Sequence, residues 1–162
     1  MTGDIQTTRV LNEADKWATF TLSGELFALR VEDVQEVMME QPLTPVPLAP
    51  PHIVGLLNLR GQIMPAVDLR RRLQFPARAA SQRPAMIVLK MQGVLVSLVV
   101  DEIGDVLELP TSGWREPPET LDARHRGFIL GICPIDRHVV LGLNVDGLIA
   151  DEDRPTRDGK GN

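Results

Sequence analysis

Cysteine is nearly missing from this chain and tyrosine is missing altogether, since Cys133 is the only cysteine among 162 residues. One cysteine cannot form an intramolecular disulfide, and Cys133 has no Cys or His neighbours at the spacing of a zinc site. A reducing compartment is therefore expected. Aromatic residues are also scarce, with four Phe and two Trp. The core must be built mainly from Val, Leu and Ile, which favour β-strands.

Long hydrophobic runs are absent too. The longest apolar stretch, MIVLKMQGVLVSLVV at 86–100, is interrupted by Lys90, Gln92 and Gly93 and is too short to span a bilayer. No positively charged segment precedes an apolar run near the start, so we expect no secretion signal. These features predict a cytoplasmic protein without direct membrane insertion.

The net charge of −5 argues against a general nucleic-acid binder, but residues 60–83 are locally basic. This segment sets six arginines against a single acid: Arg60, Arg70, Arg71, Arg72, Arg78 and Arg83. One interpretation is a small-barrel nucleic-acid-binding protein that uses the basic 60–83 face, although stacking aromatics would be needed and only Phe75 lies near. The other is that Arg70 and Arg71 cover a solvated helical turn, and the residues favour it.

The chain divides into two similar halves. Residues 23–38 align without a gap on residues 92–107, which places Gly24 on Gly93 at an offset of 69 residues. Residues 53–69 align on residues 129–145 at an offset of 76. The second half therefore carries a seven-residue insertion, most simply within residues 111–127. We predict an internal duplication.

Each half is predicted to be rich in strands. Apolar runs flank the dipeptides Ser23-Gly24, Gln92-Gly93 and Arg60-Gly61, a pattern typical of tight hairpins. We predict an all-β fold of two small barrels packed face to face, with short helical turns such as one capped by Asp68. The first barrel is expected mainly in residues 16–80 and the second mainly in 84–150. The polar ends, residues 1–15 and 151–162, are predicted to be flexible tails.

Catalytic chemistry is not indicated. The three histidines are scattered, and none lies at a metal-ligand spacing from another His or Cys. Cys133 follows Gly131-Ile132 in an apolar run and is interpreted as a small buried hydrophobic residue rather than a nucleophile. We therefore expect no enzyme activity, no metal site and no cofactor.

The two halves differ at one hairpin tip. The first half has Asn58 and Arg60 where the second has Pro134 and Asp136. A purely structural turn needs no arginine, whose planar fork favours carboxylate partners. Glu36 is one possible mate, and a partner protein facing both residues is the other. The sequence leaves these two interpretations open.

Four blocks of the sequence resemble the CheW coupling-protein family of bacterial chemotaxis. They are VEDVQEVM (31–38), TPVPLAPPHIVGLLNLRGQIMPAVDLRRRL (44–73), VVDEIGDVLEL (99–109) and REPPETLDARHRGFILGI (115–132). Their order and spacing agree with that family from about Trp17 to Asp151. The resemblance implies a CheW-like domain over residues 16–150, built from two SH3-like five-stranded β-barrel subdomains around a shared apolar core.

The resemblance also implies a non-catalytic adaptor that couples chemoreceptors to a CheA-type histidine kinase. Its partners would be that kinase and the cytoplasmic tips of methyl-accepting chemoreceptors, so it would be recruited to membrane-associated receptor arrays. Five receptor-contacting positions carry over, and they are Val34, Glu36, Gly55, Asn58 and Arg60. Leu29 and Val31 are the corresponding choices for contact with the kinase.

Overall fold

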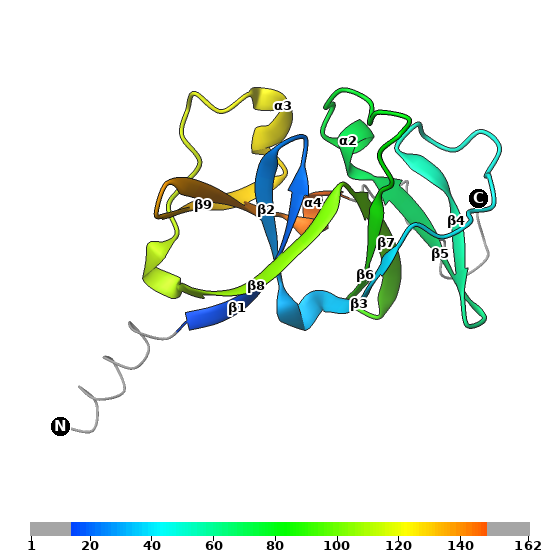
Figure 1. Cartoon of the computed structure of the whole chain (residues 1–162), viewed down its shortest axis with the longest axis horizontal. Coiled ribbons are helices and arrows are strands. Elements are labelled where there is room, and N and C mark those ends of the chain that lie inside the picture. The colour runs from blue at the N-terminus through cyan, green and yellow to red at the C-terminus, as the bar shows by residue number, and fades with distance from the viewer. Residues whose placement is uncertain (1–13, 149–162) are drawn as a thin grey trace, which may run out of the picture.

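The computed structural model describes residues 14–148, and within them ten strands form two five-stranded sheets (Figure 1). We call the sheet with strand order β8-β1-β2-β10-β9 the terminal barrel. It contains β1 (Ala14–Leu22), β2 (Glu25–Arg30), β8 (Glu102–Pro110), β9 (Ile129–Ile135) and β10 (His138–Leu143). The sheet with order β3-β6-β7-β5-β4 is called the central barrel. It contains β3 (Val34–Met39), β4 (Ile53–Leu59), β5 (Gln62–Asp68), β6 (Ala85–Met91) and β7 (Val94–Val100).

Short helical turns connect these strands. They are η1 (Val31–Asp33), α2 (Leu69–Arg72), η2 (Thr111–Gly113), α3 (Ala123–Arg126) and α4 (Val145–Leu148). Asp68 caps α2 as predicted, because its Oδ1 accepts a hydrogen bond of 3.0 Å from the Arg70 backbone N–H. Among residues 14–148, no helix has both the length and the apolar character that crossing a membrane requires.

The predicted all-β fold of two five-stranded SH3-like barrels is confirmed, and the two sheets follow one plan. The β1–β2 hairpin corresponds to the β6–β7 hairpin, and both turn through two residues of positive φ. These are Ser23 and Gly24, at 53° and 83°, and Gln92 and Gly93, at 50° and 80°. β8 pairs with β1 as β3 pairs with β6, and β10 runs parallel to β2 as β5 runs parallel to β7. The internal duplication therefore extends to the strand pairing.

The predicted division into barrels at residues 80–84 does not follow the sheets. Only η1 separates β2 from β3, and only Asp101 separates β7 from β8. β3 follows the β1–β2 hairpin in sequence but pairs with β6 of the central barrel. In the same way, β8 follows the β6–β7 hairpin but pairs with β1 of the terminal barrel. The central barrel is one continuous segment, residues 34–68 and 85–100 with their connecting loop, whereas the terminal barrel combines residues 14–30 with 102–143.

The predicted N-terminal tail is too long by two residues. Ala14 and Asp15 already belong to β1, where they pair with Pro110 and Leu109 of β8. Residues 1–13 and the predicted C-terminal tail, 151–162, lie outside the described residues.

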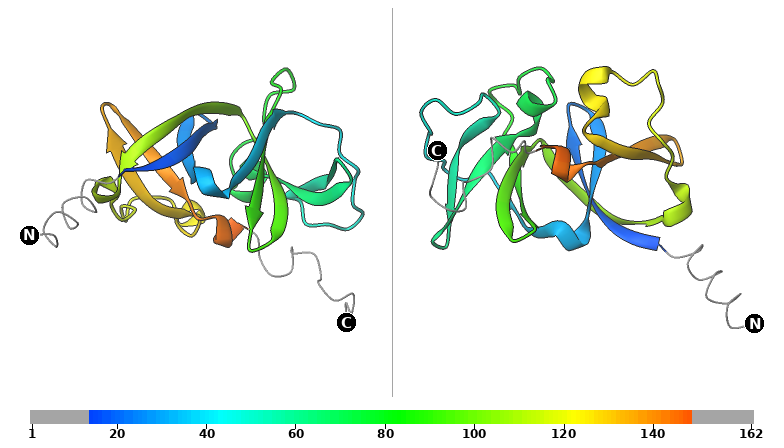
Figure 2. Two further views of the ribbon diagram at one scale, coloured as in Figure 1. Left: turned by 90° about the horizontal axis from the view of Figure 1, so that it is seen from below. Right: turned by 180° about the vertical axis from the view of Figure 1, so that it is seen from behind.

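The two barrels share one hydrophobic core between them. On β6, Ile87 and Leu89 face this shared core, while Met86 and Val88 face the interior of the central barrel. On β2, Phe27 faces the shared core in the same way. Both faces of the β1–β2 and β6–β7 hairpins are therefore buried, which explains the nearly continuous apolar run at 86–100. Figure 2 shows the two barrels side by side from two further directions.

Candidate functional site

Arg60 occupies the turn between β4 and β5 and forms a paired salt bridge with Glu36 of β3. Its Nη1 and Nη2 donate to Oε1 and Oε2 of Glu36 at 2.9 and 3.0 Å. Because β3 and β4 are the two edge strands of the central sheet, this bridge spans the seam of the barrel. The hydrogen bonds from Arg60 lower the pKa of Glu36. Glu36 is therefore the mate of Arg60, and the Arg60 side chain remains 71% exposed.

The β4–β5 turn holds Arg60 in the left-handed backbone region, which residues other than glycine rarely adopt. Arg60 has φ 53° and Gly61 φ 85°, the left-handed pair of a type I′ hairpin turn. The side-chain oxygen of Asn58 accepts a 3.1 Å hydrogen bond from the Gly61 backbone N–H. Asn58 thus shapes the turn that carries Arg60, and its exposed side chain lies beside it.

Gly55 has a structural task that both barrels share. It is buried, with φ 154°, and a Cβ there would lie 2.9 Å from both Leu43 Cβ and Thr44 O. Thr44 and Leu56 exchange backbone hydrogen bonds of 2.9 and 2.8 Å across this contact. In the terminal barrel, Gly131 is crossed by residue 115 in the same way. Gly55 therefore anchors the 40–52 loop on β4 rather than offering a side surface to a partner.

The remaining predicted positions lie near the crossover between barrels. Val34 begins β3 and is half-buried against the shared core, and Val31 is half-buried in η1. Leu29 is 0% exposed in the same core. A side chain with no exposed surface cannot contact a kinase, so Leu29 is wrong as a contact residue. Both faces of β2 are covered in its middle, which leaves no outward position there.

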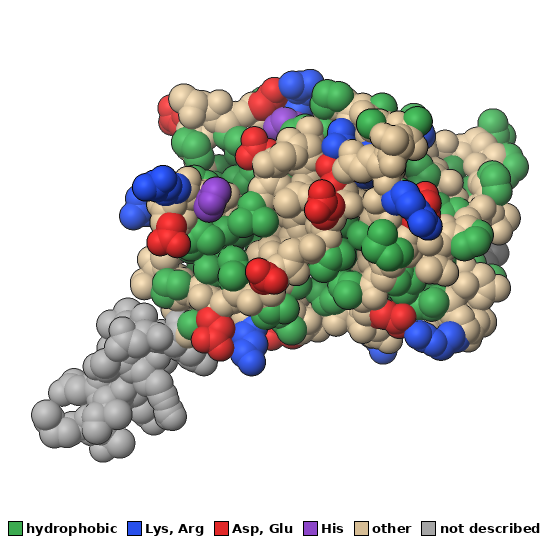
Figure 3. Space-filling view, viewed as in Figure 1, with side chains coloured by type: hydrophobic (Ala, Val, Ile, Leu, Met, Phe, Trp, Pro, Cys, Tyr) green, Lys and Arg blue, Asp and Glu red, His purple; other side chains and the backbone are tan. Residues whose placement is uncertain are grey.

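Sequence reasoning missed the exposed apolar side chains of the two crossover strands. β3 and β8 both run across the face shown in Figures 1 and 3, where hydrophobic side chains alternate with acidic ones. The exposed apolar residues of these strands are Val37, Met39, Ile103 and Val106. Val37 and Val106 are repeat partners at the offset of 69, so the repeat was a usable signal that both strands carry an apolar side chain at this position.

The basic 60–83 segment is largely neutralised by partners. Arg70 is only 12% exposed and binds Asp101 through Nε and Nη2 at 2.9 and 2.6 Å. Arg78, 10% exposed, donates from Nε to Asp101 Oδ1 at 2.9 Å. Arg72 donates to the Leu148 carbonyl at 2.7 Å. The prediction of a solvated Arg70 is therefore wrong, and the nucleic-acid interpretation loses most of its free cations.

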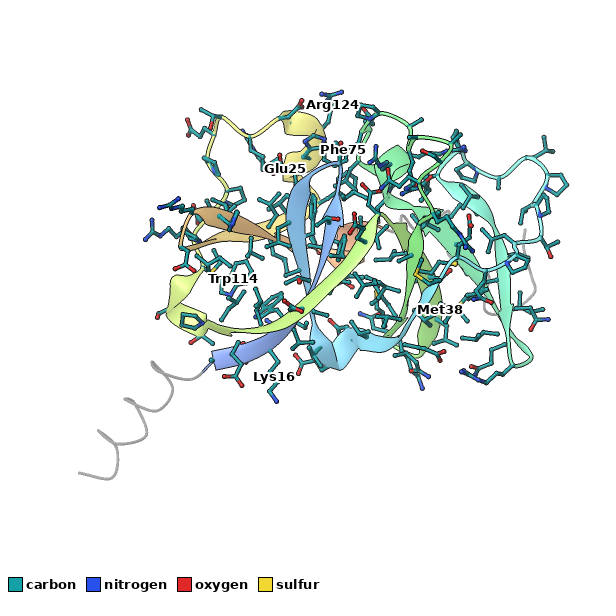
Figure 4. The ribbon with its side chains drawn as sticks, viewed as in Figure 1. Lys16, Glu25, Met38, Phe75, Trp114 and Arg124 are labelled. Carbon is teal, nitrogen blue, oxygen red and sulfur yellow. The ribbon has the colours of Figure 1, made fainter. Side chains whose placement is uncertain are left out.

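The surface also holds two neighbouring cavities, one of about 420 Å³ on the terminal barrel and one of about 310 Å³ that Lys90 and Met91 of the central barrel also line. Both are lined by Trp17, Arg30 and Leu130. The Arg30 guanidinium lies 5.7 Å from the Trp17 ring centroid, and the ring of Trp114, labelled in Figure 4, lies 4.6 Å from that of Trp17. Burial raises the pKa of the Cys133 thiol. Within residues 14–148, no three His, Cys, Asp or Glu side chains come together in a way that could hold a metal ion.

Comparison with known proteins identifies the family. A family model described as the CheW-like domain matches residues 16–153. The chain belongs to the CheW family. It is 32% identical to the chemotaxis protein CheW of Bacillus subtilis over 119 residues, which cover 74% of this chain and 72% of that protein. It is 28% identical to the chemotaxis protein CheW of Rhizobium meliloti over 135 residues, 83% of this chain and 87% of that one.

A solved CheW structure has the same fold. The scaffolding protein TtCheW of Thermoanaerobacter tengcongensis superposes with a TM-score of 0.78 at 28% identity, covering 88% of this chain and 97% of the other. Together with the family model, this solved structure supports the two-barrel fold of the chain.

Proposed function

We propose that this protein is a non-catalytic adaptor that couples chemoreceptors to a CheA-type histidine kinase. Family membership supports the adaptor class, and the Arg60–Glu36 bridge is the single observation that supports a partner site on the central barrel. The adaptor acts in the cytoplasm and is recruited to membrane-associated arrays by the tips of the receptors.

In this proposal the receptor contacts the seam of the central barrel. Glu36 and Arg60 hold each other in one geometry, so their side chains lose little further freedom when a partner binds. Arg60 is mostly exposed and keeps N–H groups that Glu36 does not use. Val34 lies two residues before Glu36 on β3 and Asn58 two residues before Arg60, while Gly55 lets the 40–52 loop pack on β4. The exposed apolar side chains of β3, Val37 and Met39, alternate with Glu36 along the strand and lie on its other face.

The kinase contact is proposed near η1, where Val31 is half-buried. η1 joins the two barrels, so a kinase bound there and a receptor bound at the seam would share strand β3. The adaptor then works by differential binding, and a coupling free energy of roughly 1–3 kcal/mol between the two partners is sufficient.

Charge reversal at the bridge tests the receptor site. Arg60→Glu should weaken binding to a receptor cytoplasmic fragment and reduce receptor-dependent kinase activity, because two carboxylates would then face each other. The double variant Arg60→Glu with Glu36→Arg restores an ion pair in reversed order. Recovery in the double variant would show that the bridge acts by shaping the turn, whereas continued loss would show that the receptor reads the Arg60 charge.

Arg137→Glu is the matched control, because Arg137 is exposed at the equivalent hairpin tip of the terminal barrel. It should leave both measurements unchanged. If folded Arg60→Glu protein binds the fragment and supports the kinase as well as wild type does, the proposed receptor site is wrong.

A further inference from the structure

A buried group of charges joins the two barrels at one of their two crossovers. Asp101, 4% exposed, lies between β7 and β8. Its carboxylate accepts hydrogen bonds from Arg70 and Arg78 of the central barrel segment and, at 2.8 Å, from the Ser23 backbone N–H of the β1–β2 turn. Its own backbone N–H donates to the Thr21 carbonyl at 3.1 Å. One side chain therefore links both barrels.

Two further contacts from the same segment reach the terminal barrel. Arg72 of α2 donates to the Leu148 carbonyl at 2.7 Å, and its guanidinium lies 5.1 Å from the Phe128 ring centroid. Phe75, which follows α2, stacks on His125 of α3 at 4.7 Å. Figure 4 shows Phe75 close to the α3 turn that carries Arg124. We name the set of Asp101, Arg70, Arg72, Phe75 and Arg78 the α2 clasp.

The other crossover has no comparable set among the described residues. Glu32 of η1 is the repeat counterpart of Asp101 at the offset of 69. It is 70% exposed and meets only Arg30, at 3.5 Å. In Figures 1 and 2, α2 and α3 lie together at one side of the barrel junction, and η1 lies at the opposite side. An exposed pair of this kind contributes little stability, whereas a buried charge pair strongly resists separation.

We propose that the α2 clasp locks the angle between the two barrels, and that releasing it lets them rock about their shared core. This deepens the proposed function, because Val34 and Glu36 follow η1 directly and so lie at the side without a clasp. Because the clasp fixes the angle between the barrels, a shift of β3 that a receptor causes in the central barrel also moves the terminal barrel. The clasp residues are thus positioning residues, which act without touching a partner.

The barrel angle can be measured in the free full-length protein, independently of any partner. Spin labels on Gln62→Cys and Arg137→Cys, at exposed hairpin tips of the two barrels, report their separation in a Cys133→Ala background. The unaltered clasp should give one narrow distance distribution. Asp101→Asn should at least double the width of this distribution, because Arg70 and Arg78 then lose the charged carboxylate that ties them to the β1–β2 turn, and only Asp68, at 3.7 Å from Arg78, remains. Glu32→Gln should leave the width unchanged.

Two variants separate locking from general stability. Leu57→Ala removes packing inside the central barrel and should lower the melting temperature without broadening the distribution. Arg78→Gln keeps the paired Arg70–Asp101 contact and should broaden the distance distribution less than Asp101→Asn does. It provides the test if Asp101→Asn fails to fold. The proposal is overturned if the distance distribution keeps its width in folded Asp101→Asn, or in Arg78→Gln where Asp101→Asn does not fold. It is also overturned if Leu57→Ala broadens the distribution as much as the clasp variants do.

The coupling assay distinguishes the two proposals. Folded clasp variants should bind the receptor fragment and the kinase separately within about twofold of wild type, yet lose most of the receptor-dependent change in kinase activity. Wild-type protein that binds neither partner would refute the proposed function and leave the spin-label result standing. Clasp variants that couple as wild type does would refute the transmission part of this inference alone.

Discussion

Acidification should remove about 2 kcal/mol of stability that the protein owes to Asp101. Burial raises the pKa of this carboxyl, but the hydrogen bonds from Arg70, the Ser23 backbone and Arg78 outweigh it and lower the pKa from 3.8 to about 2. The folded state therefore binds a proton less readily than the unfolded state. The contribution is fully present above the unfolded pKa and is lost as the pH falls from about 5 toward 2.

The magnitude follows from the two pKa values. At 1.36 kcal/mol per pKa unit, the change from 3.8 to about 2 corresponds to about 2 kcal/mol. Domains of this kind unfold with about 5 to 15 kcal/mol, so the effect is large enough to measure. Asp101→Asn should cost about 3 kcal/mol at pH 7, because in this buried site Arg70 loses its paired carboxylate and Arg78 keeps only Asp68, at 3.7 Å.

Urea unfolding followed by tryptophan fluorescence, at several pH values from 2.5 to 7, measures both effects. The difference in unfolding free energy between wild type and Asp101→Asn should shrink by about 2 kcal/mol on going to the acid end. Glu32→Gln is the control, because Glu32 is 70% exposed and its ion pair with Arg30, at 3.5 Å, contributes little. A difference that stays constant with pH would refute the assignment of a low pKa to Asp101.

Three substitutions and one labelling reaction test the packing further. Gly55→Ala should lower the unfolding free energy by about 2 kcal/mol or more, because its Cβ would lie 2.9 Å from two atoms of the segment that crosses β4. Gly24→Ala, which has φ 83° and open space, should cost only about 1 kcal/mol, and equal losses in urea unfolding would contradict the packing argument. Arg72→Gln should cost about 1 to 2 kcal/mol through its lost hydrogen bond and ring contact, and an unchanged melting temperature would count against this. Cys133, 1% exposed, should react with a maleimide only as fast as the chain opens, so rapid labelling of folded protein at pH 8 would show an error in its placement.

The hairpins were predictable from sequence, and the barrel membership was not. Glycine at the second turn position marks a positive φ, so Gly24, Gly61 and Gly93 identified three hairpins correctly. The same apolar patterns suit a strand in either sheet, so the patterns alone could not assign β3 and β8. In the structure only Asp101 separates β7 from β8, which is too short a connection for the two strands to pair with each other, and β8 pairs with β1 instead.

In the candidate site too, contacts suggested by the repeat were predictable, and contacts between the two repeat units were not. Arg60 and Glu36 could be considered as a pair because the tip of one repeat carried an arginine that its counterpart lacked. Arg70 and Asp101 lie 31 residues apart and belong to different units of the repeat. Their pairing depends on how the barrels dock, and this is why Arg70 and Arg71 were interpreted as covering a solvated helical turn. Repeat symmetry predicts what the halves share, not what holds them together.

The exchange of strands between the halves also sets an order of assembly during synthesis. The β1–β2 hairpin leaves the ribosome first, but its own barrel needs β8, β9 and β10, which are made last. The central barrel is complete once residue 100 has emerged, and the waiting hairpin already offers it the apolar face of the shared core. Closure of the terminal barrel therefore requires contacts of large sequence separation, those of β1 with β8 and of β2 with β10, and should be the slow step in refolding. Until that step, a nascent chain exposes the β1 edge that β8 later covers.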